Sequence, residues 1–299
     1  MNFIQGFNRI TQLRKRRGFQ ALLLLLTILG VIFAQPATAF QVQVTPSAPQ
    51  LGDTLSVQVQ QPTTQSAPTV EYNGKTYPMF AIGSNQYRTL LPTTPLDQAG
   101  NRPIKVTNGD QQQVVSITLR DRTFPTQSIW LPPDKEDLTG TDFEFDQVDA
   151  FKQLVTPEKY WQGAFLRPSS GSVSTIYGVR RYYNGVFAED YYHRGVDYAA
   201  GTGSPVVAPA AGRVALVGRE SEGFTIHGNV IGIDHGQGVA GIFVHLSRID
   251  VEAGQMVKAG QVIGAVGSTG ISTGPHLHWG LYVNGQAVDP VPWRYDGID

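Results

Sequence analysis

Alternating apolar and polar positions characterise the first part of the chain after residue 40. Two runs show this most clearly, with apolar residues at Leu55, Val57 and Val59 and again at Val115, Ile117 and Leu119. A period of two is typical of β-strands that bury one face. Asn73-Gly74, between "TVEY" and "KTYPMF", is a hairpin signal. We therefore expect a small β-sandwich of short strands over residues 40–121.

The pattern changes over residues 122–160. Pro125, Pro132 and Pro133 indicate a linker. Apolar residues then recur at helical spacing at Val148, Phe151, Leu154 and Val155. This spacing predicts one short helix at about 143–155, whose expected role is packing.

Residues 161–299 are rich in glycine and contain short apolar runs. These runs predict strands near 205–208, 212–218, 229–234, 239–245, 261–266 and 277–283. Asn284-Gly285 is again a hairpin signal. We expect a mainly β chain with two β domains, the second a Gly-rich antiparallel domain, and only a few short helices.

The first 39 residues have the three parts of a secretory signal. Arg14-Lys15-Arg16-Arg17 is basic, residues 21–34 are nearly all apolar, and Ala37-Thr38-Ala39 is a small-x-small cleavage site. The sequence thus predicts export to the periplasm or cell wall. The apolar stretch is short for a membrane span, so an uncleaved anchor is the secondary interpretation. Arg16-Arg17 also leaves twin-arginine export open beside the ordinary secretory route.

Charge and cysteine content limit the partners that the protein can bind and the residues that can serve as metal ligands. The segment 1–39 holds five of the 23 Lys and Arg and none of the 24 Asp and Glu, so the remainder has a formal net charge of −6. An acidic protein is a poor candidate for nucleic-acid binding, and we expect none. The absence of cysteine excludes disulfides and thiolate metal sites, so a metal site would use His, Asp or Glu.

All six histidines fall within 86 residues of the second half, at positions 193, 227, 235, 245, 276 and 278. His193 and Asp197 are four residues apart, which places both side chains on one face of a strand or of a helix. His276 and His278 are two apart, so a strand would aim both imidazoles to one side. Clustering of this kind indicates a metal or acid–base site.

A catalytic zinc site uses three protein ligands and keeps one open position. His193, Asp197 and one histidine of the His276/His278 pair would supply two nitrogens and one oxygen. His245 and the other histidine of the pair then remain beside the metal. Imidazoles that titrate near neutral pH suit general acid–base work there.

These motifs resemble a known family. "HRGVDYAAGTGSPVVAPAAGRV", "VHLS" and "GSTGISTGPHLH" are similar to the lysostaphin/LytM-type zinc metallopeptidases of the bacterial cell wall, over roughly residues 165–292. The resemblance implies zinc ligands at His193, Asp197 and His278, and catalytic histidines at His245 and His276. It implies cleavage of peptidoglycan peptide crosslinks. In many members an Ig-like or other accessory region precedes the enzyme, which matches residues 40–121.

Alternative interpretations remain beside this one. A non-enzymatic relative would bind the wall or activate another hydrolase. The glycines of 251–270 also resemble carrier barrels, but Lys258 lacks the setting of a modified lysine. His227 and His235 are interpreted as structural. The tyrosines flanking His193 either pack or line a substrate groove beside the metal site. Residues 40–121 are expected to contact this groove. The sequence leaves open the crosslink cleaved and the oligomeric state.

Overall fold

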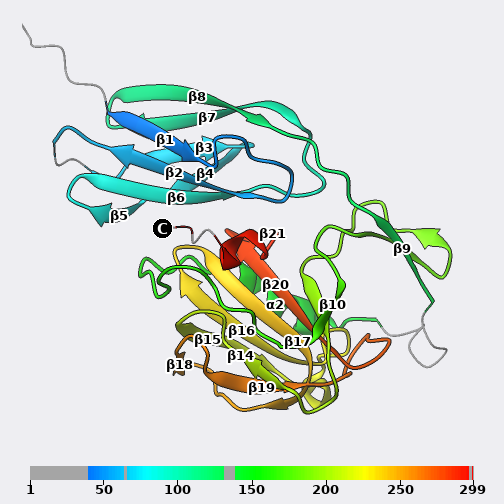
Figure 1. The fold of residues 1–299 in the computed structure, drawn as a ribbon. Coiled ribbons are helices and arrows are strands. Elements are labelled where there is room, and N and C mark those ends of the chain that lie inside the picture. Colours follow the sequence, from blue (N-terminus) through cyan, green and yellow to red (C-terminus); the bar gives the residue numbers. More distant parts are fainter. Residues whose placement is uncertain (1–39, 64–65, 131–138, 296–297, 299) are drawn as a thin grey trace, which may run out of the picture. The chain divides into compact units, whose positions relative to one another are not determined.

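The computed structural model describes residues 40–63, 66–130, 139–295 and 298 (Figure 1). The expected secretory signal, residues 1–39, lies outside the described residues. Within the described ranges, no helix is both long enough and apolar enough to cross a membrane.

Residues 40–121 form two four-stranded antiparallel sheets, which we call the N-terminal sheets. One has the order β1 (Gln41–Thr45), β2 (Thr54–Gln60), β6 (Gln86–Pro92), β5 (Phe80–Gly83). The other has the order β4 (Lys75–Pro78), β3 (Thr69–Tyr72), β7 (Gly100–Asn108), β8 (Gln111–Leu119). Both sheets contribute to one buried core, with Leu55, Val57 and Val59 facing Val70, Ile104 and Val106 in the same cluster. The alternating pattern thus places its apolar face as expected.

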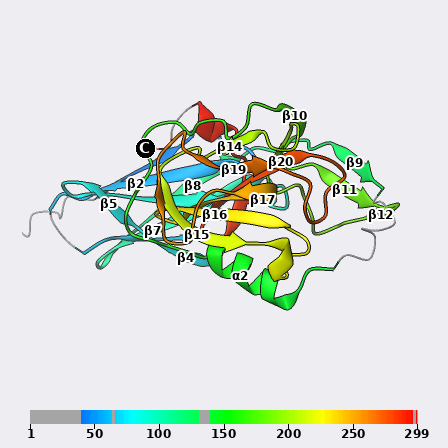
Figure 2. The same ribbon diagram turned by 90° about the horizontal axis from the view of Figure 1, so that it is seen from below.

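The linker contributes one helix and one strand. Helix α2 (Asp142–Lys152) begins at the N-cap Thr141 and buries Glu144, Val148 and Phe151. It packs against strand β15 (Gly212–Gly218) of the larger sheet (Figure 2). Strand β9 (Thr126–Ile129), which the sequence pattern did not predict, pairs in parallel with β11 (Arg180–Tyr183). A parallel partner that comes from about 54 residues away along the chain leaves no local signal.

The second half forms a ten-stranded sheet, which we call the C-terminal sheet. Its main order is β10 (Ser172–Thr175), β13 (Val196–Ala199), β20 (His276–Val283), β17 (Val239–Ile249), β16 (Asn229–Gly236), β15 and β18 (Met256–Val257). Off this path lie β14 (Pro205–Val207), β19 (Val262–Val266) and β21 (Gln286–Val288). Strand β12 (Val186–Phe187) and the 3₁₀ turns η1 (Glu220–Glu222) and η2 (Pro292–Arg294) complete the described elements.

The strands predicted from apolar runs are confirmed, and so is the mainly β class with a single helix among the described residues. Both hairpin signals hold, because Asn73-Gly74 and Asn284-Gly285 adopt positive φ at both positions (47° and 74°, 47° and 83°). Mirror-image two-residue turns require this backbone, and Asn-Gly adopts it readily. Strands β16 and β17 are buried on both faces, and the core that they build includes Trp161, Trp279 and Trp293.

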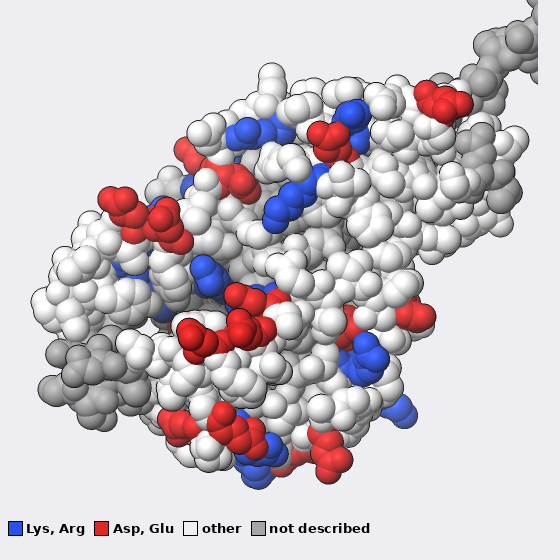
Figure 3. Space-filling view, turned by 180° about the vertical axis from the view of Figure 1, so that it is seen from behind, with Lys and Arg blue, Asp and Glu red and all other residues white. Residues whose placement is uncertain are grey.

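Figure 3 shows the charged side chains on one face of the molecule, where acidic and basic groups lie interspersed in small sets. Exposed ion pairs among the described residues include Lys105 with Glu71 and Arg248 with Asp250. Neighbouring charges of opposite sign partly cancel, so this face carries a mixed potential.

Candidate active site

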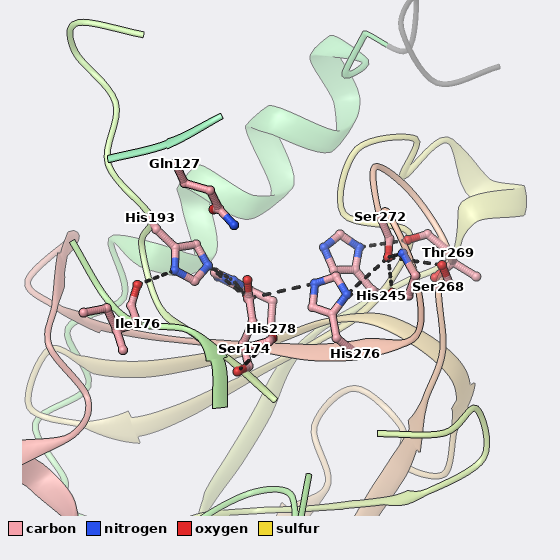
Figure 4. Close-up of polar contacts among 12 residues, drawn as sticks. Gln127, Ser174, Ile176, His193, His245, Ser268, Thr269, Ser272, His276 and His278 are labelled. Atoms are coloured by element: carbon pink, nitrogen blue, oxygen red, sulfur yellow. Dashed lines mark hydrogen bonds and ion pairs between the residues drawn. The ribbon is translucent and has the colours of Figure 1, made fainter. Parts of the chain in front are cut away.

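Three side chains converge where β13 and β20 pair. Two of them, His193 and His278, are labelled in Figure 4. His193 Nε2 lies 2.9 Å from Asp197 Oδ1 and 2.9 Å from His278 Nδ1. His278 Nδ1 in turn lies 2.8 Å from Asp197 Oδ1. The three residues form a triad that could hold a metal ion.

Strand pairing creates this arrangement. Asp197 on β13 is the direct Cα partner of His278 on the antiparallel β20. His193 lies just before β13, and Gly195 between them runs close to β20. A Cβ on Gly195 would lie 2.3 Å from the Trp279 carbonyl oxygen and 2.9 Å from His278 Cε1. Glycine is therefore needed for the close approach that joins His193 to the other two residues.

The ring orientation of His193 shows what the triad is suited to bind. Its Nδ1 lies 2.8 Å from the Ile176 carbonyl oxygen, which can accept only if Nδ1 carries the proton. In the neutral ring Nε2 is then a lone-pair donor to metal. With a cation bound, His193 Nε2, Asp197 Oδ1 and His278 Nδ1 would each be unprotonated and offer it a lone pair. Two nitrogens and one oxygen suit zinc, and the backbone contact fixes the tautomer.

Electrostatics keep the triad ready for a cation. Burial opposes ionisation of Asp197, but contacts with His193 and His278 outweigh it and hold the Asp197 pKa well below its usual range. Burial lowers the pKa of His278 to about 4, so this ring stays neutral at physiological pH. An ionised carboxylate and neutral imidazoles are the protonation states that metal binding requires.

His245 and His276 lie beside the triad. Their ring centroids are 4.8 Å apart, and His276 Nε2 lies 3.9 Å from Asp197 Oδ1. Each Nδ1 contacts a backbone carbonyl at 2.8 Å, that of Thr269 for His245 and that of Gly274 for His276. These contacts fix Nδ1–H as a donor in both rings, which leaves each Nε2 free to exchange a proton. Burial and neighbouring imidazoles hold the His245 pKa well below its usual value.

The backbone of His245 is in an uncommon conformation. Its φ is +64°, in the left-handed region, within strand β17. A non-glycine residue held in such a region costs on the order of 1–3 kcal/mol and persists where neighbouring structure holds it. Its amide donates to the His227 carbonyl oxygen at 3.0 Å.

Some residues near the site have no signal in the sequence motifs. Arg181 Nη2 lies 3.6 Å from Asp197 Oδ2, and Arg181 Nε donates to Gln127 Oε1 at 3.3 Å. The pairing of β9 with β11 brings Gln127 there. The sequence analysis did not predict strand β11. Without that strand, the alternation that places Arg181 and Tyr183 on the same face could not be used.

The other histidines and the tyrosines have simpler environments. His235 is fully buried, and burial lowers its pKa to about 4, which fits the structural interpretation. His227 contacts the buried carboxylate of Glu144 at 2.6 Å, a pairing that the sequence interpretation missed. Tyr192 is 4% exposed and donates to the Ala287 carbonyl oxygen at 3.0 Å, so it packs. Tyr182 is exposed, and its ring contacts that of Phe187 in a tilted arrangement.

Comparison with known proteins places this geometry in a family. The model of peptidase family M23 matches residues 191–290. DD-carboxypeptidase/endopeptidase Mpg of Neisseria meningitidis is 48% identical over 99 residues, covering 33% of this chain and 22% of Mpg. Peptidoglycan DD-endopeptidase ShyC of Vibrio cholerae is 38% identical over 129 residues, covering 42% of this chain and 29% of ShyC. The chain thus spans less than a third of either relative's length.

A solved structure extends the likeness beyond the matched segment. The crystal structure of a putative peptidase M23 from Pseudomonas aeruginosa aligns with a TM-score of 0.62 at 26% identity, covering 83% of this chain and 95% of that one. The family match, residues 191–290, contains His193, Asp197 and His278. The C-terminal half of this chain therefore belongs to peptidase family M23.

Proposed function

We propose that this chain is an exported zinc metalloendopeptidase that hydrolyses peptide crosslinks of bacterial peptidoglycan. One observation carries the proposal: three potential ligand atoms converge within 2.8–2.9 Å of one another, with two further imidazoles beside them. The names of the relatives, a DD-carboxypeptidase/endopeptidase and a peptidoglycan DD-endopeptidase, support the substrate class.

In the proposed reaction His193, Asp197 and His278 would hold a zinc ion. When bound, zinc would supply Lewis-acid chemistry, since such an ion polarises a carbonyl and lowers the pKa of water. Arg181 beside Asp197 Oδ2 restrains the rotation of the carboxylate and so keeps Oδ1 directed at the triad.

His245 and His276 handle the proton and the developing charge. Each has Nδ1–H committed to a backbone carbonyl, so each Nε2 can accept a proton from the attacking water or donate one to the leaving amine. The low pKa of His245 keeps it neutral at physiological pH, ready to act as an acceptor.

The cellular setting belongs to the same proposal. The basic and apolar segment 1–39 supports export to the periplasm or cell wall. Residues 40–121 are proposed as an Ig-like domain that contacts the substrate groove and thereby limits the access of substrate to the site. Weakening the contacts of this domain with the rest of the chain would then increase turnover.

The direct test uses the purified protein with isolated cell-wall sacculi, with and without a chelator. We expect soluble products only when zinc is bound, and mass spectrometry of digested muropeptides would identify the bond cleaved. A protein that binds zinc yet releases no product would contradict the enzyme proposal and favour a wall-binding role. A protein that binds no metal would contradict both.

A further inference from the structure

Helix α2 carries a fully buried carboxylate, Glu144, at its first turn. Glu144 is 0% exposed and lies outside the segment that matches family M23. The N-cap Thr141 accepts from the Glu144 amide at 3.0 Å and donates to the Gly223 carbonyl oxygen at 2.9 Å. The start of the helix is therefore tied to the chain that leads into residues 225–228, which we call the anchor loop.

Glu144 is surrounded by donors from the anchor loop. Oε1 accepts from the His227 amide at 2.7 Å and lies 2.6 Å from His227 Nδ1. Oε2 accepts from the Thr225 amide at 3.0 Å and from the Ile226 amide at 3.1 Å. Burial opposes ionisation of Glu144, but the bonds from His227 and Ile226 outweigh it and lower its pKa to about 2. One ionised side chain thus fixes three consecutive residues.

The anchor loop holds His245 from two directions. The His227 carbonyl oxygen accepts from the His245 amide at 3.0 Å, which secures the main chain. The Ile226 carbonyl oxygen accepts from the Ile271 amide at 2.9 Å, two residues beyond Thr269. The Thr269 carbonyl oxygen is the partner of the His245 imidazole. Displacing the anchor loop would therefore disturb both the backbone and the ring of His245.

His245 depends on such support because its φ of +64° lies in the left-handed region. A histidine in this conformation relaxes unless its surroundings hold it. The bond to His227 and the tight fit at Gly228, where a Cβ would lie 2.4 Å from Thr269 Oγ1, supply that restraint.

We propose that Glu144 is a positioning residue for His245, acting through the anchor loop. The inference rests on the proposed function for the role of His245 in peptide hydrolysis. It gives helix α2 a part in the reaction, because the helix delivers the carboxylate that keeps one proton-transfer group in place.

The proposal is tested by measuring kcat and KM of the zinc-loaded full-length protein and of its variants Glu144→Gln and Glu144→Asp. Gln keeps the shape but loses the charge that the three amides face, and Asp is one methylene too short to reach them all. We expect kcat to fall roughly 10–100-fold in Glu144→Gln, the loss typical of a misplaced catalytic group, with KM and bound zinc unchanged. Asp146→Asn, an equal charge change on the exposed side of the same helix, is the control and should leave kcat unchanged.

A double-mutant cycle with His245→Ala separates positioning from general damage. If Glu144 acts through His245, Glu144→Gln lowers kcat no further in the His245→Ala background. A full additional 10–100-fold loss there would show that Glu144 acts elsewhere, and would overturn the proposal.

Hydrogen exchange of the His245 Nδ1 proton, followed by NMR, needs no turnover. We expect exchange to become at least about tenfold faster in Glu144→Gln, while the His193 Nδ1 proton, held by Ile176, is unaffected. Unchanged exchange at His245 would contradict the positioning role even if activity fell. Faster exchange in a protein that cleaves no sacculi would overturn the enzyme proposal and leave the positioning role intact. Should the Gln variant not fold, the Asp variant gives the same readouts.

Discussion

Three of the four imidazoles at the site are fixed in the same way, through Nδ1–H on a backbone carbonyl. The acceptors are the carbonyl oxygens of Ile176 for His193, Thr269 for His245 and Gly274 for His276. His278 differs, because its Nδ1 faces Asp197 Oδ1 and His193 Nε2 directly. Ring orientation therefore separates His278 from His276, although the two are only two residues apart.

Replacing these two histidines separately should have different consequences. In His278→Gln, zinc affinity should fall by more than the roughly 10–100-fold typical when a hydrogen-bond partner of a ligand is lost, because a ligand atom itself is gone. In His276→Gln, zinc should bind as in the wild type while kcat falls roughly 10²–10⁴-fold, as expected for loss of a general acid or base. Chelator competition and sacculus digestion measure the two effects. Equal zinc loss in both variants would contradict the division of roles.

At the scale of elements, the pairing of β13 with β20 sets the site. Asp197 and His278 are direct partners, and Ala199 pairs with His276. The register of one strand pair thus fixes both the triad and the place of a third imidazole. A slip by one residue would turn both histidines to the other face of the sheet.

Gly195→Ala tests this dependence on close strand approach. The new methyl group would overlap the Trp279 carbonyl oxygen, so β13 or β20 must shift and His278 moves with it. We expect zinc affinity to fall by roughly 10–100-fold. Gly201→Ala is the matched control, because the nearest atom to its Cβ would be 4.0 Å away. Wild-type zinc affinity in Gly195→Ala would show that the site tolerates the shift.

Helix α2 has its own pH signature through Glu144. The folded carboxyl stays ionised down to about pH 2, while an ordinary one takes up a proton near 4.5. The unfolded chain therefore binds more protons between these values, and stability should be full above pH 4.5 and fall as pH is lowered toward 2. The upper bound of this loss is on the order of 3 kcal/mol.

Urea unfolding above and below that window measures the effect. Glu144→Gln should remove this part of the pH dependence, and Asp146→Asn, on the exposed face of α2, should retain it. An unchanged pH slope in Glu144→Gln would mean that Glu144 is not the group that titrates.

At the scale of the whole molecule, the N-terminal sheets and the C-terminal sheet share buried contacts. The described residues from 40 onward belong to one compact unit. Arg88 of β6, 1% exposed, donates to Gln237 Oε1 at 2.7 Å and to the Ile298 carbonyl oxygen at 3.1 Å. Leu90 of the same strand belongs to the core of the C-terminal sheet, and Trp293 Nε1 donates to Thr54 Oγ1 at 3.1 Å.

Arg88→Met should weaken this junction. It leaves a buried acceptor on Gln237 and a partly buried one on Ile298 without their charged donor, and we expect a loss of about 1.5–3 kcal/mol in the free energy of unfolding. Lys105→Met is the control, since its exposed pair with Glu71 contributes little. Arg88→Met also tests whether residues 40–121 limit the access of substrate to the groove. Increased turnover on sacculi would support this role, and unchanged turnover at reduced stability would argue against it.

Much of the fold and the site could be predicted from the sequence. The strands of both halves are local features that the periodicity of apolar residues predicts. The two hairpins are likewise predicted by their Asn-Gly pairs. His193, Asp197 and His278, which the structure brings together, stand in short motifs, and zinc chemistry limits which residue types can bind. The helix over residues 142–152 was also predictable, but only as a packing element.

The sequence by itself thus determined the strand pattern, the turns and the residues able to bind a metal, because each depends on neighbours within a few positions. Only the tertiary structure decided the rest. Three features depend on contacts between residues far apart in the chain. They are the left-handed backbone of His245, the hydrogen bond between Arg181 and Gln127, and the contact of the Glu144 carboxylate with His227. Such contacts follow from how strands and helix pack, and no local pattern encodes them.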